Sequence, residues 1–242
     1  MLELSFLGSG SAFCKDGRYW SAFLLNGRYL FDAPPTTLPQ LRRLGRATKD
    51  IDVIFISHFH GDHFAGLPFL LLDYSYVTRR ERDLTIVGPP GCQDFLESFN
   101  AMCYPSLRGR EDDGYRRIYL EAAPGQEQTV AEVSFAALPV PHAAGLQSFG
   151  YRVTIGGRSV AYTGDCEYSE AVLQLAHGAD VLVMDCTHAE RGPLHMGFAD
   201  ALELRRQLPR ETAIVLTHRE SDPDVSGLEN VFLAQDLATL RF

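Results

Sequence analysis

Residues 51–63 read Ile-Asp-Val-Ile-Phe-Ile-Ser-His-Phe-His-Gly-Asp-His, a run whose character changes abruptly at its middle. The first seven residues are mostly β-branched or aromatic, which is typical of a buried strand. The remainder carries four side chains that can bind metals, at positions 58, 60, 62 and 63. A strand that ends in such a group predicts a metal site at the edge of a sheet.

The spacing of these four side chains favours two ions over one. His58 and His60 lie two residues apart, so at a strand end their rings point to the same side. Asp62 and His63 follow on the next turn and face a neighbouring position. Imidazole with carboxylate suits zinc, iron or manganese better than calcium or magnesium. The alternative, a polar loop that merely contains histidines, does not explain this spacing.

Two complete coordination shells need further ligands, and later strands supply them. Each of three β-patterned runs is followed by one candidate: residues 133–140 by His142, residues 158–164 by Asp165, and residues 212–217 by His218. A single histidine at such a place is usually an ordinary hydrogen-bonded side chain. Because polar residues gather where strands end, the shared placement of all three favours a common site instead.

The rest of the chain alternates between strand and helix patterns. Strands are predicted at residues 2–7, 22–25 and 29–32, the last two joined by the hairpin turn Asn26-Gly27. Helical spacing follows at residues 38–44, 91–103, 168–177 and 198–208. This alternation predicts an α/β protein, and we expect one domain over residues 1–242. We also expect a mobile loop at residues 105–117.

The charge balance argues against a general nucleic-acid binder. Lys and Arg number 22 against 31 Asp and Glu, which gives a formal net charge of -9. Two clusters of arginine stand out: Arg42, Arg43 and Arg46, and Arg79, Arg80 and Arg82. We interpret each cluster as a solvated helix or loop face, with a local basic rim as the alternative.

Cysteine usage and hydropathy indicate a reducing compartment. The five cysteines are odd in number and form no C-x-x-C pair, so neither a disulfide framework nor a thiolate zinc site is expected. No basic leader precedes an apolar segment, and no run approaches the ~18 apolar residues that span a membrane. We therefore expect a cytoplasmic protein that does not enter membranes. A homodimer is left open.

The whole ligand set resembles that of the metallo-β-lactamase superfamily. The resemblance rests on His58-x-His60-x-Asp62-His63, followed by His142, Asp165 and His218. It implies that His58, His60 and His142 hold one metal, that Asp62, His63 and His218 hold the other, and that Asp165 bridges them. The implied fold is a four-layer αβ/βα sandwich, in which two mixed β-sheets are flanked by helices.

Such a centre would perform hydrolysis. Two divalent ions about 3.5 to 4 Å apart lower the pKa of a shared water toward neutrality, so hydroxide is available as the nucleophile. Asp62 is the expected catalytic carboxylate, because it can bind metal and orient that hydroxide. Zinc is the expected ion, with manganese or iron as alternatives. The centre leaves open which bond is cleaved.

A finer resemblance is to ribonuclease Z and its phosphodiesterase relatives. It rests on Leu7-Gly-Ser-Gly-Ser-Ala12 with Ser21 and Phe31-Asp32, and on Met184-Asp-Cys-Thr187 followed by His195. In that group a histidine at the latter place donates a proton to the leaving group, so the resemblance implies that His195 is catalytic. The alternative is a surface histidine that caps the helix beginning near Gly197.

Two departures separate the chain from ribonuclease Z. That family carries a tRNA-binding arm between the ligands that match His142 and Asp165, yet only 23 positions separate them here. Its D-C-G-E-G element is replaced by Asp32-Ala-Pro-Pro35. We therefore expect a phosphodiesterase for a small, cyclic or RNA-like phosphodiester, with a small-molecule or nucleotide-type substrate and without tRNA. The alternatives are a lactonase, thioesterase or β-lactamase-like carbonyl hydrolase, and a noncatalytic metal-dependent sensor.

Overall fold

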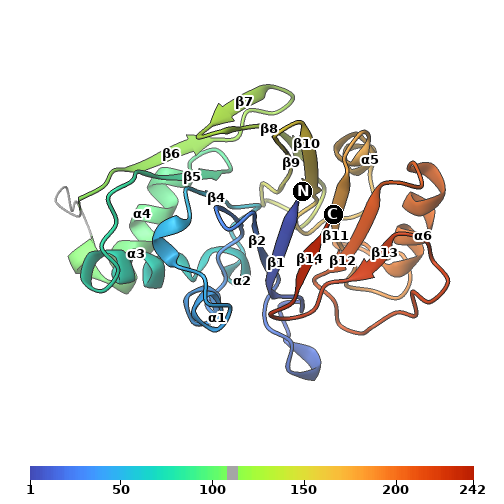
Figure 1. Ribbon diagram of the computed structural model, residues 1–242, viewed down its shortest axis with the longest axis horizontal. Coiled ribbons are helices and arrows are strands. Elements are labelled where there is room, and N and C mark those ends of the chain that lie inside the picture. The colour runs from blue at the N-terminus through green and yellow to red at the C-terminus, as the bar shows by residue number, and fades with distance from the viewer. Residues whose placement is uncertain (108–113) are drawn as a thin grey trace.

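Two β-sheets packed face to face form the centre of the computed structural model, which describes residues 1–107 and 114–242 (Figure 1). In spatial order the first sheet contains β14 (Thr239–Arg241), β1 (Glu3–Gly8), β2 (Ala22–Leu25), β3 (Tyr29–Phe31), β4 (Val53–Phe55), β5 (Leu84–Gly88) and β6 (Arg117–Glu121). The second contains β13 (Val231–Leu233), β12 (Ala213–Thr217), β11 (Val181–Asp185), β10 (Arg158–Tyr162), β9 (Phe149–Ile155), β8 (Val133–Pro139) and β7 (Glu127–Val130). Both sheets combine parallel and antiparallel pairs.

Helices cover the outer face of each sheet. α1 (Thr37–Arg43), α3 (Leu67–Tyr76) and α4 (Cys92–Cys103) pack on the first sheet, and α5 (Glu170–Ala176) and α6 (Phe198–Gln207) pack on the second. Shorter turns are α2 (Gly61–Phe64), η1 (Lys15–Gly17), η2 (Thr48–Asp50) and η3 (Pro105–Leu107). The predicted four-layer sandwich of two mixed sheets flanked by helices is confirmed.

Alternation along β4 shows how the layers are built. Val53 and Phe55 face the other sheet, whereas Ile54 points to the helices, so the strand is apolar throughout because both faces are covered. Phe55 stacks on Phe31 with ring centroids 4.9 Å apart, and Tyr162 of the second sheet meets Phe31 edge-on at 5.7 Å. Aromatic contacts thus join the two sheets directly beneath the predicted site.

The predicted strands lead to the expected positions. β4, β8, β10 and β12 all end shortly before a candidate ligand.

Helix α3 is absent from the prediction, because its apolar residues lie on nearly all sides and give no amphipathic period. The predicted loop at residues 105–117 begins with η3 and ends where β6 begins, and its residues 108–113 lie outside the described part of the chain. No described helix is long and apolar enough to cross a membrane.

A close backbone contact supports the loop that carries the histidines. Ala33 donates its backbone N–H to the carbonyl of His63 at 2.7 Å, and Gly66 donates to the carbonyl of Ala33 at 2.7 Å. A Cβ on Gly66 would lie 1.9 Å from the carbonyl oxygen of Pro34. The segment that replaces D-C-G-E-G therefore fits directly against α2 and α3, and only glycine allows that approach.

Replacing Gly66 by alanine is expected to lower the free energy of unfolding by about 1 to 3 kcal/mol, because the backbone of Pro34 must move. Urea unfolding followed by circular dichroism measures the change. Gly61→Ala is the matched control, since a Cβ at that position of the same loop meets nothing within 4 Å. Equal stability of the two variants would contradict this account of the contact.

Candidate metal centre

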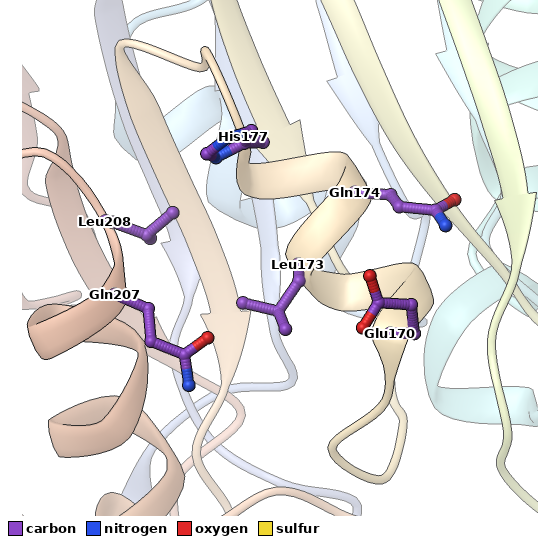
Figure 2. A pocket seen from close by; sticks show the side chains of 6 residues that line it. All are labelled: Glu170, Leu173, Gln174, His177, Gln207 and Leu208. Atoms are coloured by element: carbon purple, nitrogen blue, oxygen red, sulfur yellow. The ribbon is translucent and has the colours of Figure 1, made fainter.

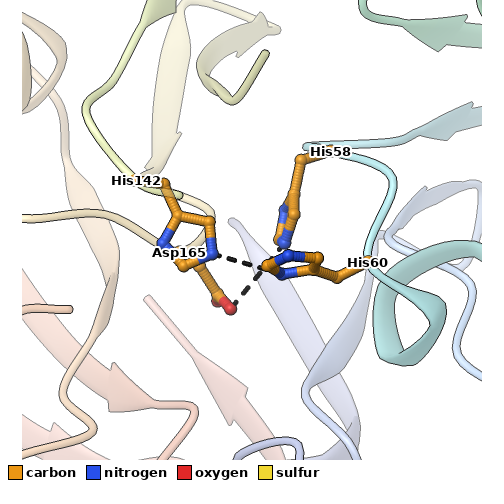
Figure 3. Close-up of side chains that lie close together, drawn as sticks. All are labelled: His58, His60, His142 and Asp165. Atoms are coloured by element: carbon orange, nitrogen blue, oxygen red, sulfur yellow. Dashed lines mark hydrogen bonds and ion pairs between the residues drawn. The ribbon is translucent and has the colours of Figure 1, made fainter. Parts of the chain in front are cut away.

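Four of the predicted ligands form one cluster. His58, His60, His142 and Asp165 each offer a ligand atom, and these atoms all lie within 4.8 Å of one another (Figure 3). His60 Nδ1 and His142 Nε2 are 3.2 Å apart, and His58 Nε2 is 3.9 Å from Asp165 Oδ2. The donors come from the loop after β4 and from the ends of β8 and β10, so strand ends distant in sequence form one site.

A second cluster lies beside the first and shares Asp165 with it. Asp62, His63, Asp165 and His218 also offer atoms within 4.8 Å of one another. Asp165 Oδ2 lies 3.1 Å from His63 Nε2 and 3.2 Å from His218 Nε2. The structure thus brings all seven predicted ligands together, in the two groups that the resemblance implies and with Asp165 between them.

The buried atoms in this centre have unmet bonding capacity. Four buried atoms have no hydrogen-bond partner among the described residues: Nε2 of His58, of His63 and of His218, and Oδ1 of Asp165. Leaving a buried polar atom without a partner costs roughly 1 to 3 kcal/mol. A divalent cation between the clusters would supply the missing partner to each atom, so the residues present fit metal binding.

The pKa shifts of His218 and Asp165 also fit metal binding. Burial alone would lower the pKa of His218, but the carboxylates of Asp165, Asp185 and Asp62 outweigh it and raise that pKa to about 10. Burial would raise the pKa of Asp165, yet the neighbouring histidines hold it well below its usual range. The clustered carboxylates therefore draw positive charge into the site, which cations would provide.

Hydrogen bonds to the far side of the rings fix their orientation. Nδ1 of His58 lies 2.9 Å from Ser57 Oγ, and Nδ1 of His63 lies 2.8 Å from the carboxylate of Asp32. Nδ1 of His142 lies 2.7 Å from the carbonyl oxygen of Leu194. Nδ1 of His218 lies 2.8 Å from Thr187 Oγ1. Each of these contacts leaves Nε2 for the centre. Such partners set the tautomer and the angle of a metal-binding imidazole.

Asp32 is a functional residue that sequence reasoning missed. Its carboxylate is fully buried and accepts hydrogen bonds from the Ser57 N–H at 2.7 Å, the Ser57 hydroxyl at 2.9 Å and the Tyr162 hydroxyl at 2.7 Å. It also contacts His63, so one group positions the loop of both clusters. The available signal was its place: Asp32 directly follows β3, as the predicted ligands follow their strands.

His195 lies within the centre, beside His218. Its Nδ1 is 2.8 Å from Asp185 Oδ2, and its ring stacks on that of His218 with centroids 5.2 Å apart. The N–H of Gly197 at the start of α6 donates instead to Asp200, so His195 is not a helix cap. Burial lowers the pKa of His195, but the hydrogen bond and charge of Asp185 outweigh it, and the pKa is raised.

A separate pocket of about 230 Å³ lies between α5 and α6 on the outer face of the second sheet (Figure 2). It is lined by Glu170, Leu173, Gln174, His177, Gln207 and Leu208. None of these residues belongs to the two clusters. The candidate metal ligands therefore lie at the sheet edge and not in this pocket.

Comparison with known proteins identifies the family. Residues 27–222 match the family model described as the beta-lactamase superfamily domain. The chain belongs to the metallo-β-lactamase superfamily. Its two mixed sheets flanked by helices are those that the superfamily resemblance implied, and the protein is a metal-dependent hydrolase.

Relatives place the chain in the ribonuclease Z-like branch of the superfamily. Ribonuclease Z of Methanosarcina mazei is 30% identical over 100% of this chain and 98% of its own length. Human tRNase Z, short form, is 26% identical with a TM-score of 0.76, and covers 99% of this chain and 98% of its own. The metallo-β-lactamase fold protein YhfI of Bacillus subtilis shares the fold over the full length of both chains, with a TM-score of 0.79 and 18% identity.

The Methanosarcina mazei relative is longer than this chain. The alignment spans 302 positions against 242 residues here, so about 60 positions of that relative have no counterpart. In this chain, the space between His142 and Asp165 holds only the β9–β10 hairpin, whose turn is Gly156-Gly157. Within the described residues, this hairpin is the only pair of strands between the two ligands, and the sequence predicted no inserted arm there.

Asp32→Asn is expected to weaken metal binding by about 10- to 100-fold. One charged oxygen of Asp32 contacts both Tyr162 and His63, and an uncharged amide group does not replace it. Metal content after dialysis against graded chelator gives the change. Tyr162→Phe removes only one of these hydrogen bonds and should have a smaller effect. Unchanged metal retention in Asp32→Asn would remove the positioning role of this carboxylate.

Proposed function

We propose that this protein is a phosphodiesterase with two zinc ions, held as the two clusters divide the ligands. The supporting observation is the pair Asp185 and His195, which lies with Asp165 and His218 in a third group of the centre and adds an imidazole to the seven predicted ligands. A thioester or aryl ester, which loses a stable leaving group, does not need a proton donor at this position. A phosphodiester that loses an alkoxide does.

Each residue has a defined part in this proposal. His58, His60 and His142 would hold one ion and Asp62, His63 and His218 the other, and Asp165 belongs to both clusters. Two divalent ions, when bound, activate water for attack and stabilise negative charge on the phosphoryl oxygens. Asp62 lies at the open side of the centre, where it can orient the attacking water. Its side chain is 14% exposed, against 3% for Asp165.

The Asp185–His195 pair donates the proton. Asp185 is fully buried, and its Oδ2 accepts from Nδ1 of His195, so Nε2 is the nitrogen left to face a leaving group. Against the effect of burial, the hydrogen bond and charge of Asp185 raise the pKa of the His195 imidazole, which favours its protonated form. The Thr187 hydroxyl donates to the other oxygen of Asp185 at 2.7 Å, and Thr187 Oγ1 lies 2.8 Å from Nδ1 of His218. Thr187 therefore links the Asp185–His195 pair to a candidate metal ligand.

The substrate class follows from the same residues and from the relatives. Curated relatives named ribonuclease Z favour an RNA-like or nucleotide substrate. The short β9–β10 hairpin favours a substrate other than tRNA. A carbonyl hydrolase on the same metals and a noncatalytic sensor are the competing functions, and neither a thioesterase nor a sensor needs His195 as a general acid.

Zinc-reconstituted protein tested on phosphodiesters, lactones, thioesters and β-lactams distinguishes these functions. We expect kcat/KM on phosphodiesters to exceed the values on the carbonyl compounds by about 100-fold or more, since the proposed centre combines charge stabilisation of the phosphoryl oxygens with a general acid for the alkoxide. Chelator should abolish the activity. Preferential turnover of a lactone or thioester would favour the carbonyl function, and absence of turnover on every class would favour the sensor.

His195→Ala is expected to reduce turnover of alkyl or ribosyl phosphodiesters by about 10² to 10⁴-fold, because their alkoxide must be protonated as it leaves. Bis(p-nitrophenyl) phosphate should lose far less, since its phenolate leaves unaided. Metal content is the control and should not change. Equal losses on both substrates would mean that His195 only positions the centre, and full activity on both would exclude it from the mechanism.

A further inference from the structure

The loop that carries His195 is paired at its base and exposed at its tip. It comprises residues 186–197, between β11 and α6. His188 and Gly197 form a bridge that pairs the two arms of the loop. Between these arms most residues are exposed, and Leu194, next to His195, is 43% exposed. The position of His195 therefore depends on contacts that the tip makes with other elements.

A carboxylate from outside the loop binds this tip. The Leu194 N–H donates to Oε1 of Glu167 at 2.8 Å. Glu167 lies two residues after Asp165, and its own N–H donates to the carbonyl of Pro141 at 2.8 Å. The backbone of Glu167 is thus fixed beside the segments that carry His142 and Asp165. Its side chain offers the loop an acceptor at a fixed place.

The other end of the same residue binds a candidate metal ligand. The carbonyl oxygen of Leu194 accepts from Nδ1 of His142 at 2.7 Å, and Nε2 of His142 faces His60 in the first cluster. The next residue along the chain is His195, whose ring centroid lies 4.9 Å from that of His142. Leu194 therefore links a ligand of the first cluster to the proposed general acid.

Leu194 adopts a backbone conformation that leucine rarely takes. Its φ is 67°, in the left-handed region, where the Cβ of an L-residue crowds the backbone. Packing of its side chain does not explain this conformation, because that side chain is exposed. The two hydrogen bonds, to Glu167 and from His142, offset the strain. Without the carboxylate the peptide would relax, which would displace both the acceptor of His142 and the backbone of His195.

The carboxylate of Glu167 has no other structural task. Within residues 1–107 and 114–242 it forms no ion pair, and its hydrogen bond is to Leu194, 27 positions away. It does not belong to the first turn of a helix, since α5 begins at Glu170 with Ser169 as its N-cap. A hydrogen bond from a backbone N–H to a carboxylate is stronger than one to a neutral acceptor. The contact is therefore suited to hold a strained peptide.

We propose that Glu167 is a positioning residue, which holds the Leu194 peptide so that His142 and His195 keep their places relative to each other. This inference rests on the proposed phosphodiesterase function, because that function gives His195 its task. Glu167 touches neither cluster and acts only through Leu194. Removing its carboxylate should impair metal retention and proton donation, and should leave substrate affinity unchanged.

The test compares two replacements of similar length. Glu167→Gln keeps an oxygen that accepts from the Leu194 N–H, whereas the thioether of Glu167→Met is a poor acceptor. Glu121→Met is the matched control, because Oε1 of Glu121 accepts from the backbone N–H of Gly91 at 2.8 Å, and Glu121 belongs to none of the clusters. All three variants change the formal net charge by the same amount.

Amide hydrogen exchange of the zinc-loaded proteins, followed by NMR, measures the contact itself. We expect the protection of the Leu194 amide to fall about tenfold or more in Glu167→Met, and by less than about threefold in Glu167→Gln. Zinc retention against chelator should also fall in Glu167→Met, by about three- to tenfold, because His142 loses a fixed acceptor at Nδ1. Glu121→Met should change neither quantity. Unchanged exchange at Leu194, or unchanged zinc retention, would overturn the proposal.

Steady-state kinetics in excess zinc measure the consequence for His195. On an alkyl or ribosyl phosphodiester, Glu167→Met should lower kcat about tenfold and leave KM within about twofold. Bis(p-nitrophenyl) phosphate should lose less than about threefold, because its phenolate leaves unaided. Glu167→Gln should recover most of the lost kcat, and Glu121→Met should retain the wild-type value. Equal losses on both substrates, or equal losses in both Glu167 variants, would overturn the positioning role.

The exchange and zinc measurements separate this proposal from the proposed function. If the wild-type protein hydrolyses no phosphodiester, yet Glu167→Met loses Leu194 protection and zinc retention, the positioning role toward His142 stands and the proposed activity fails. If the wild-type protein hydrolyses diesters, and Glu167→Met matches it in exchange and in kcat, the activity stands and the positioning role fails.

Discussion

A single buried carboxylate, that of Asp32, ties the two sheets to the metal centre. It follows β3, accepts hydrogen bonds from Ser57, contacts His63 in the loop after β4, and accepts another hydrogen bond from Tyr162 on β10. A buried charge is costly unless its oxygens are surrounded by donors. Because the donors come from both sheets, this charge is stabilised only when the sandwich closes correctly. The contacts that close the fold at this edge therefore also orient a histidine for metal binding.

Parallel strands give the molecule two chemically different edges. The carboxyl ends of β3 and β4 lead to carboxylates and imidazoles, and their amino ends lie beside arginine and lysine. Fixed cations close to the metals would repel the ions, so the placement of these arginines at the opposite edge, where carboxylates pair with them, favours metal binding at the centre.

Local pattern was enough to predict much of this arrangement. A buried strand that ends in H-x-H-x-D-H, and single ligands after three later strands, predicted the seven side chains that converge, whereas the sandwich was implied by the resemblance to the metallo-β-lactamase superfamily. Helix α3 could not be predicted in this way, because apolar side chains such as Phe69 and Tyr76 also occupy its exposed face, so no polar face marks its period. Nor does the pattern reveal that Gly66 allows the backbone of Pro34 to approach.

The sequence by itself determined the elements and the chemistry available at their ends, because strand periodicity and ligand spacing are short-range properties of the chain. Only the tertiary structure decided which partners meet. Tyr162 lies 130 positions from Asp32, and Thr187 lies 31 positions from His218, so no local pattern relates them. The same holds for the arginines: Arg42 donates to Asp73 while Arg43, its neighbour, donates to Tyr19, because their side chains leave α1 in different directions and only packing fixes the partner of each.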